Sequence, residues 1–235
     1  QNRENKVKLL RKIYSFFFSK PYFYQEDINR GSFDKIYDFH LKATMMKPSL
    51  WRKDRFYNLW SIVNSLKDQD GHIAECGVWK GLSCLIISEA IKDNNPYFKG
   101  ENIVLIDSFE GLSQPKLKDG VTGGKEGDFS CSLDDVKNNL NQFPKIEYFK
   151  GWVPEILDEL PQNLYKFVHL DMDLVEPTIG ALDYFSSRMT SGGLILLDDY
   201  SSKRWPNLKK EVDAFVKINN LRSFSLSTCQ KCIFF

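Results

Sequence analysis

From residue 72 onward, short apolar runs alternate with segments of helical periodicity, and this alternation limits the possible folds more than any other feature of the chain. Five of the runs are predicted strands: 72–76, 102–107, 146–150, 166–171 and 194–198. The helices that follow are expected at 81–91, 133–140, 155–160, 177–189 and 207–218. Strands that are apolar throughout, and that are separated by helices, form a parallel sheet covered on both faces. The sequence therefore predicts an α/β domain over residues 71–235, which ends in two further strands at 223–227 and 231–235.

Residues 1–70 differ from the rest, because they are rich in aromatic and basic residues and show no alternation of period two. A short amphipathic helix is predicted at 6–18. Another is predicted at 55–66, where one apolar face is formed by Phe56, Leu59, Trp60, Val63 and Leu66. The segment 33–51 has no clear period and is a candidate lid or dimer contact. We therefore expect a helical extension over 1–70 and place a candidate homo-oligomer contact in it.

The near-equal numbers of basic and acidic residues argue against highly charged partners. The 32 basic and 31 acidic residues leave a formal charge of +1, so neither nucleic acid nor an anionic membrane is an expected partner. No apolar run approaches the roughly 20 residues that span a bilayer, and no signal-peptide core follows the first residues. The expected location is the cytoplasm.

The five cysteines are scattered through apolar stretches, which is typical of small buried side chains rather than of disulfides. Cys229 and Cys232 have the spacing of half a zinc site. A zinc site needs two further ligands, and His40, His72 and His169 provide no matching pair. Chance spacing is the preferred interpretation.

A turn that contains glycines follows the first predicted strand, at the edge where parallel α/β sheets bind their ligands. It reads Glu75-Cys-Gly77-Val-Trp79-Lys-Gly81-Leu-Ser83. Gly77 and Gly81 allow a sharp turn and a close approach of a ligand, while the start of the next helix offers unpaired N–H groups. Ser83 is placed to bind a carboxylate. The alternative is that the glycines serve only the turn, and the spacing is not the GxGxxG of dinucleotide enzymes.

Asp107 stands at the end of the second strand and is followed by Ser108. A carboxylate in this position accepts hydrogen bonds from both hydroxyls of a ribose, as the acidic residue of dinucleotide-binding folds does. The alternative is a solvated residue that caps the next helix. Together with the glycine turn, Asp107 indicates a nucleoside-binding site.

Two pairs of aspartates follow the fourth and fifth strands: Asp171 with Asp173, and Asp198 with Asp199. Four converging carboxylates repel each other unless they are protonated or bound to a cation. Their oxygens suit Mg²⁺, with Ca²⁺ or Mn²⁺ as alternatives. Such an ion lowers the pKa of a substrate hydroxyl, and the uncoordinated one of Asp171 and Asp173 is the candidate base. His169 lies on the same side of its strand, and we expect it to be packed there rather than to act as the base.

Six short segments stand in order along residues 44–216: Arg55-Phe-Tyr-Asn-Leu, Glu75-x-Gly-Val-Trp-x-Gly81, Asp107-Ser-Phe-Glu-Gly-Leu112, Gly151-Trp-Val-Pro-Glu155, Leu170-Asp-Met-Asp-Leu-x-Glu-Pro-Thr178 and Gly192-Gly-x-x-x-x-Asp-Asp-Tyr200. With these segments the chain resembles the macrocin O-methyltransferase (TylF) family, a branch of the class I S-adenosylmethionine-dependent methyltransferases. The resemblance implies a Rossmann-like sheet that is mostly parallel, with an antiparallel C-terminal strand and helices on both faces. It also implies S-adenosylmethionine as the cofactor.

Individual roles follow from the resemblance. The residues expected to line the cofactor site are Glu75, Gly77, Trp79, Gly81, Ser83, Asp107 and Ser108, with Gly151 and Trp152 flanking the adenine. The expected ligands of Mg²⁺ are Asp171, Asp198 and Asp199, and the expected catalytic residues are Asp171 and Asp173, the latter close to the acceptor hydroxyl.

The expected function is metal-assisted methylation of a hydroxyl on a sugar or a glycosylated small molecule, since known members of the family methylate a sugar hydroxyl on a macrolide. A surface glycan or a nucleotide sugar would serve equally as acceptor, and the first 40 residues are expected to determine its specificity. The second hypothesis is a catechol or phenol methyltransferase, but the catalytic lysine of those enzymes is replaced by Leu174. A nicotinamide-dependent oxidoreductase and a non-catalytic interaction protein are disfavoured by the missing GxGxxG and by the four aspartates.

Overall fold

The computed structural model describes residues 30–120 and 124–235. The chain divides into two compact units, Gln1–Lys35 and Ile36–Phe235, and the second contains the sheet and every helix from α3 onward. The helix predicted at 6–18 lies outside the described residues. None of the helices in the described ranges is long and apolar enough to cross a bilayer.

A seven-stranded sheet forms the centre of the second unit, in the order β3-β2-β1-β4-β5-β7-β6. The strands are β1 (His72–Cys76), β2 (Ile103–Asp107), β3 (Glu147–Lys150), β4 (Tyr165–Leu170), β5 (Met189–Leu197), β6 (Arg222–Ser225) and β7 (Lys231–Phe234). Strands β1 to β5 are parallel, whereas β7 is antiparallel to both of its neighbours, β5 and β6. This confirms the expected mostly parallel α/β sheet with an antiparallel C-terminal strand.

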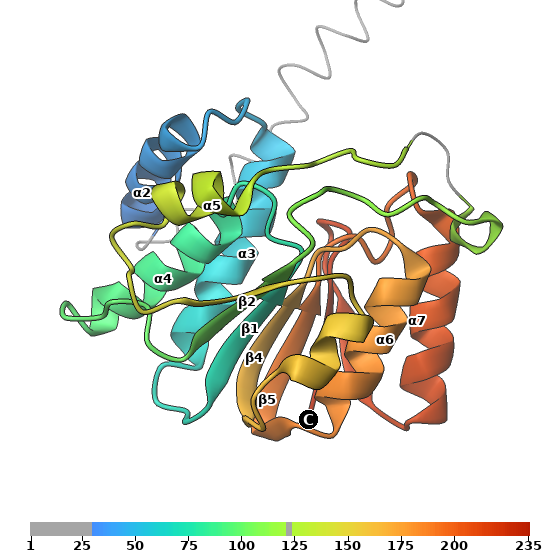
Figure 1. Cartoon of the computed structure of the whole chain (residues 1–235). Helices are drawn as coiled ribbons and strands as arrows, with labels where there is room; N and C mark the ends of the chain where they lie inside the picture. The colour runs from blue at the N-terminus through green and yellow to red at the C-terminus, as the bar shows by residue number, and fades with distance from the viewer. Residues whose placement is uncertain (1–29, 121–123) are drawn as a thin grey trace, which may run out of the picture. The chain divides into compact units, whose positions relative to one another are not determined.

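Helices cover both faces of the sheet, with α3 and α4 on one side and α6 and α7 on the other (Figure 1). The helices are α2 (Arg30–Ala43), α3 (Leu50–Ser65), α4 (Leu82–Asn94), α5 (Leu133–Asn139), α6 (Val175–Ser186) and α7 (Pro206–Ile218). Two 3₁₀ helices, η2 (Leu117–Asp119) and η3 (Glu155–Glu159), lie in the loops, and η3 occupies the place of the short helix expected at 155–160. The domain boundary at residue 70 stays a prediction; α3, on its N-terminal side, packs against α4.

Helix capping explains where two predicted helices begin earlier than expected. Ser49 accepts a hydrogen bond from the backbone N–H of Arg52 (3.3 Å), so α3 begins at Leu50 rather than at residue 55. The first turn of α6 is capped from a distant loop, because Asp119 accepts a hydrogen bond from the N–H of Val175 (2.8 Å). Helix α6 therefore begins before the proline that was expected to start it.

Helix α2 lies within a segment for which no helix was predicted. Its buried positions Tyr37, His40 and Leu41, with Thr44 just beyond its end, do recur at helical spacing. Two of the four are polar, which hides the period in a hydrophobicity pattern. The buried ring of His40 has a polar partner, because its Nε2 lies 3.2 Å from a carboxylate oxygen of Glu89 on α4. This partner is 49 residues away in the sequence.

One hydrophobic core cluster of the described residues lies between the sheet and α6 with α7. Val104, Val168 and Ile195 on β2, β4 and β5 are fully buried there. Phe185 of α6 is also fully buried, and its ring packs edge-on against Tyr165 with centroids 5.0 Å apart. The core thus fixes the helix that follows the aspartates of β4.

We predict that Phe185→Ala lowers the free energy of unfolding by about 3–5 kcal/mol, because it opens a cavity in this core. The matched control is Phe224→Ala on β6, where the side chain is 47% exposed, with an expected loss of at most about 1 kcal/mol. Urea denaturation measures both, and equal losses would contradict this description of the core.

Candidate active site

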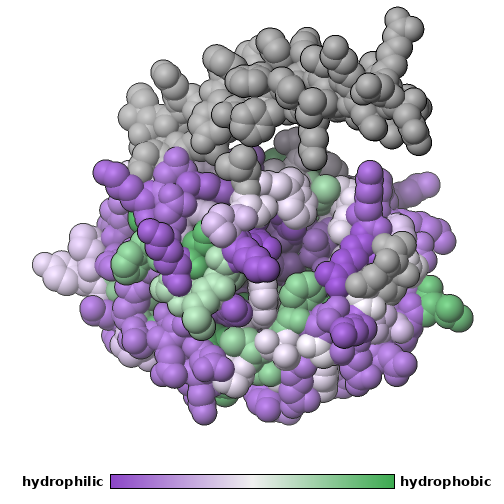
Figure 2. Space-filling model, turned by 90° about the horizontal axis from the view of Figure 1, so that it is seen from above, coloured by the Kyte–Doolittle hydropathy of each residue, from purple (hydrophilic) through white to green (hydrophobic). Residues whose placement is uncertain are grey.

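A cavity of about 400 Å³ lies at the carboxyl ends of the parallel strands. Figure 2 looks onto this edge, where mainly hydrophilic residues surround smaller apolar patches. The predicted site residues that line the cavity are Gly77, Trp79, Asp107, Ser108, Gly151, Trp152, Asp171, Asp173, Asp198 and Asp199. Helix α3 and the segment before it add Met46, Trp51, Arg52, Arg55 and Phe56. The sheet therefore brings the glycine turn and the aspartates into one space.

The turn after β1 requires glycine at position 77. The φ angle of Gly77 is +87°, and a Cβ there would lie 2.0 Å from the backbone oxygen of Asp171. Any other residue would therefore clash with the loop that follows β4. The turn that lines one side of the cavity and the loop that carries the first aspartates are packed directly together.

Asp107 binds this turn as well as lining the cavity. Its Oδ2 accepts hydrogen bonds from the N–H groups of Val78 (2.6 Å) and Trp79 (3.2 Å), and its Oδ1 accepts one from Phe109 (2.7 Å). A carboxylate offers about four acceptor positions, so three backbone bonds leave little capacity for a ligand. A ribose contact of Asp107 stays a prediction.

Three residues predicted to bind the cofactor are not among those that line the cavity: Glu75, Gly81 and Ser83. Glu75 is fully buried, and its Oε1 accepts a hydrogen bond from Nδ1 of His169 at 2.8 Å. Gly81 precedes α4 in a left-handed conformation (φ +79°), and Ser83 is buried in the first turn of that helix. Their cofactor roles also stay predictions.

Two of the four aspartates, Asp171 and Asp173, lie in an environment that disfavours their negative charges. Burial raises the pKa of Asp171 to about 7, and the charge of Asp199 acts in the same direction. Burial also raises the pKa of Asp173 well above its usual range, followed by the charges of Asp199 and Asp171. One oxygen each of Asp171 and Asp198 lies within 4.8 Å of a nitrogen of His169. This donor set fits a divalent cation, which would compensate the excess negative charge.

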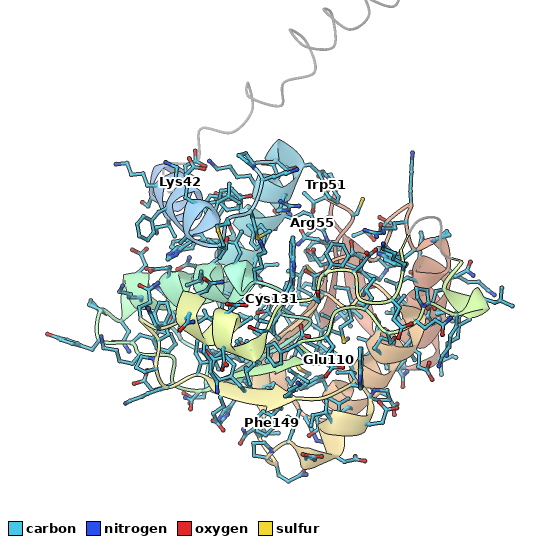
Figure 3. The ribbon with its side chains drawn as sticks, turned by 45° about the horizontal axis from the view of Figure 1, so that its top comes forward. Lys42, Trp51, Arg55, Glu110, Cys131 and Phe149 are labelled. Atoms are coloured by element: carbon cyan, nitrogen blue, oxygen red, sulfur yellow. The ribbon has the colours of Figure 1, made fainter. Side chains whose placement is uncertain are left out.

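Arg55 is a residue of the site that the sequence interpretation did not assign. Its guanidinium donates to Oδ2 of Asp198 and to Oδ1 of Asp199, the latter at 3.2 Å. The side chain lies beside Trp51, 4.5 Å from the ring centroid (Figure 3). Arg55 does stand in one of the six family segments, which is the only sequence feature that could have drawn attention to it. Its partners Asp198 and Asp199 are more than 140 residues away, so the segment does not reveal them.

Gln230 was also missed, and it fixes the other oxygen of Asp198. Its Nε2 donates to Oδ1 of Asp198 (2.7 Å), while its Oε1 accepts from Nδ2 of Asn58 (2.9 Å). Gln230 stands between Cys229 and Cys232, which are free thiols and belong to no metal-ligand group among the described residues. Gln230 is thus the residue of this segment that contacts the aspartates.

The chain matches the model of a known protein family. Residues 40–235 match the family model described as macrocin-O-methyltransferase (TylF). The chain is 24% identical over 141 residues to 8-demethyl-8-(2,3-dimethoxy-alpha-L-rhamnosyl)-tetracenomycin-C 4'-O-methyltransferase of Streptomyces olivaceus, which covers 56% of this chain and 53% of that protein. It is 23% identical over 156 residues to demethyldecarbamoylnovobiocin O-methyltransferase of Streptomyces niveus, with coverage of 62% and 58%. The chain thus spans little more than half the length of these relatives.

The fold is shared with a solved structure of a calicheamicin methyltransferase. The two superimpose with a TM-score of 0.70 at 18% identity, over 86% of this chain and 92% of that one. The family match runs from the last turn of α2 to the last residue and includes every strand of the sheet. The chain therefore belongs to the macrocin O-methyltransferase (TylF) family.

Proposed function

We propose that the protein is an S-adenosylmethionine-dependent O-methyltransferase that methylates a hydroxyl of a sugar or a glycosylated small molecule with the assistance of a divalent cation. The observation that carries this proposal is that one cavity contains both the glycine turn with Asp107 and the aspartates after β4 and β5. A methyl donor and a hydroxyl would meet there. Membership of the family and the O-methyltransferase names of both relatives support the same reaction.

The cofactor would bind on the β1–β2 side of the cavity. This side is lined by Gly77 and Trp79 of the turn after β1 and by Asp107 and Ser108 at the end of β2. Asp107 is the proposed acceptor for the ribose hydroxyls, and Trp152, whose side chain is 41% exposed, would lie against the adenine. The sulfonium would then face the aspartates across the cavity.

Asp171, Asp198 and Asp199 are the proposed ligands of Mg²⁺, which when bound would lower the pKa of the acceptor hydroxyl. In the reaction, the bond from sulfur to the methyl carbon breaks as the bond from oxygen to that carbon forms. The proton of the hydroxyl has to leave, and a carboxylate with a raised pKa is a suitable acceptor for it. We assign this role to Asp173.

The acceptor would lie against the wall formed by α3 and the segment before it. This wall is mixed, with the apolar side chains Met46, Trp51 and Phe56 beside the cationic Arg52, as in pockets that bind a ring and orient its polar groups. The relative from Streptomyces olivaceus is named for a rhamnosyl acceptor. Leu174 is buried and lines the cavity where the catechol enzymes have a lysine, which favours the sugar over the catechol hypothesis.

The cofactor role of Asp107 is tested by Asp107→Ala. We expect the dissociation constant of S-adenosylhomocysteine to rise about tenfold or more, because a ribose contact is lost together with the three backbone hydrogen bonds that hold the turn after β1. Isothermal titration calorimetry measures the affinity. Asp135→Ala, at an exposed acid outside the cavity, is the control. Unchanged affinity in the Asp107 variant would remove this residue from the cofactor site.

Asp198→Asn tests whether the cofactor and the cation are bound by different residues of the cavity. Methyl transfer to a panel of deoxysugar glycosides should fall at least about a hundredfold, as expected for loss of a metal ligand. The affinity for S-adenosylhomocysteine should be nearly unchanged, because Asp198 lies on the other side of the cavity. If Asp198→Asn also weakened the binding of S-adenosylhomocysteine, the two roles would not be separate. If the wild-type protein methylated catechols faster than glycosides, the proposed substrate class would be wrong.

Arg55 should compete with the cation, since its positive charge lies against Asp198 and Asp199. We predict that Arg55→Gln binds Mn²⁺ about tenfold more tightly than the wild type in calorimetry. Arg52→Gln removes the same charge from the cavity wall, but its guanidinium donates to the backbone oxygen of Lys47 at 2.9 Å. The control should therefore change little. Weaker binding in the Arg55 variant would show that the guanidinium supports the site instead.

A further inference from the structure

A second, much smaller cavity adjoins the main one. Its volume is about 10 Å³, which is about the space that a single water molecule needs. Its lining consists of Arg55, Phe56, Leu59, His169, Asp171, Asp198 and Gln230. A space of this size, bounded by two carboxylates and an imidazole, is suited to a single ion rather than to part of an organic substrate.

His169 presents an unpartnered ring nitrogen to this space. The residue is 2% exposed, and its Nε2 has no hydrogen-bond partner among the residues that the structure describes. The nearest oxygen of Asp198 is 3.8 Å away, beyond hydrogen-bonding distance. A buried polar atom without a partner is costly and uncommon in native proteins. Within the described ranges, no side chain satisfies this nitrogen, which is therefore open to a ligand.

The other ring nitrogen of His169 is held by Glu75. Nδ1 donates to Oε1 of Glu75 at 2.8 Å, and Glu75 is fully buried. The two residues are paired directly across β1 and β4, so the sheet fixes the ring. A proton on Nδ1 leaves a lone pair on Nε2, and a carboxylate behind a histidine is the usual arrangement of a metal-ligating imidazole.

We propose that His169 Nε2, together with one carboxylate oxygen each of Asp171 and Asp198, binds a divalent transition metal. The three ligand atoms lie within 4.8 Å of one another, and two ligands at about 2.1 Å from a common ion are about 3–4 Å apart. This inference rests on the cation assistance proposed above and specifies its ligands. His169 is thus a further ligand beside the carboxylates proposed above.

The nitrogen ligand determines the class of ion. Mg²⁺ favours sites made of oxygen atoms, whereas imidazole together with carboxylates suits Mn²⁺, Fe²⁺, Co²⁺ or Zn²⁺. The nitrogen ligand therefore widens the range of ions expected at this site from Mg²⁺ to the transition metals. Mn²⁺ is the most convenient probe, because it is paramagnetic and forms bonds to both oxygen and nitrogen.

The test is electron spin-echo spectroscopy of Mn²⁺ bound to the full chain, which detects coupling to a directly bound ¹⁴N nucleus. We expect this coupling in the wild type, and its replacement by ¹⁵N coupling when the protein is labelled with [¹⁵N]histidine. Neither measurement needs a variant. His169→Asn, whose amide can still donate to Glu75 but which lacks Nε2, should lose the coupling and bind Mn²⁺ at least about tenfold more weakly.

His40→Gln is the matched control, because His40 is 3% exposed and is likewise paired with a glutamate, Glu89. It should keep both the coupling and the affinity. Bound Mn²⁺ without nitrogen coupling would overturn the proposal but leave an all-carboxylate cation site, and with it the proposed function. The absence of Mn²⁺ binding would overturn both the proposal and the metal assistance, while calorimetry with S-adenosylhomocysteine on the same preparation tests the methyltransferase separately.

Discussion

Repulsion among partly buried carboxylates is the constraint on which the rest of the structure depends. Asp171, Asp173, Asp198 and Asp199 share one cavity wall, and transferring a charge from water to such a place costs several kcal/mol unless it is compensated. Arg55 supplies part of the compensation, and the raised pKa values of Asp171 and Asp173 show that it is incomplete. A divalent cation would supply the rest, which gives the cluster a chemical purpose beyond its own stability.

The parallel sheet places the aspartates after β4 and β5 next to the turn after β1, where the nucleoside is proposed to bind. Gly77 lets the turn after β1 pack against the backbone of Asp171, and Asp107 ties the same turn to the end of β2. Helix α3 is connected to the aspartates through Arg55. The proposed cofactor, cation and acceptor sites therefore lie on one frame of strands and helices, on different sides of the same cavity.

Much of the fold and part of the site could be predicted because they depend on local patterns. Apolar runs indicated the strands, and a residue at the end of a parallel strand must lie at the ligand-binding edge, which placed Asp107 and Asp198 correctly. The position along a strand does not say which way its last side chains point, and Glu75 turned out to bind His169 across the sheet. The helix around His40 and the pairing of Arg55 with Asp198 depend on partners far away in the sequence, which no local pattern contains.

The central claim is that the carboxylates at the ends of β4 and β5 form a cation site beside a cofactor pocket. Anomalous diffraction from crystals grown with Mn²⁺ and S-adenosylhomocysteine tests it most directly. The account predicts an anomalous peak in contact with Asp171 and Asp198, and the adenosyl group between Gly77 and Asp107. It would be contradicted by crystals in which Arg55 still holds Asp198 with no metal peak nearby at saturating Mn²⁺, or in which the nucleoside lies away from the β1–β2 edge.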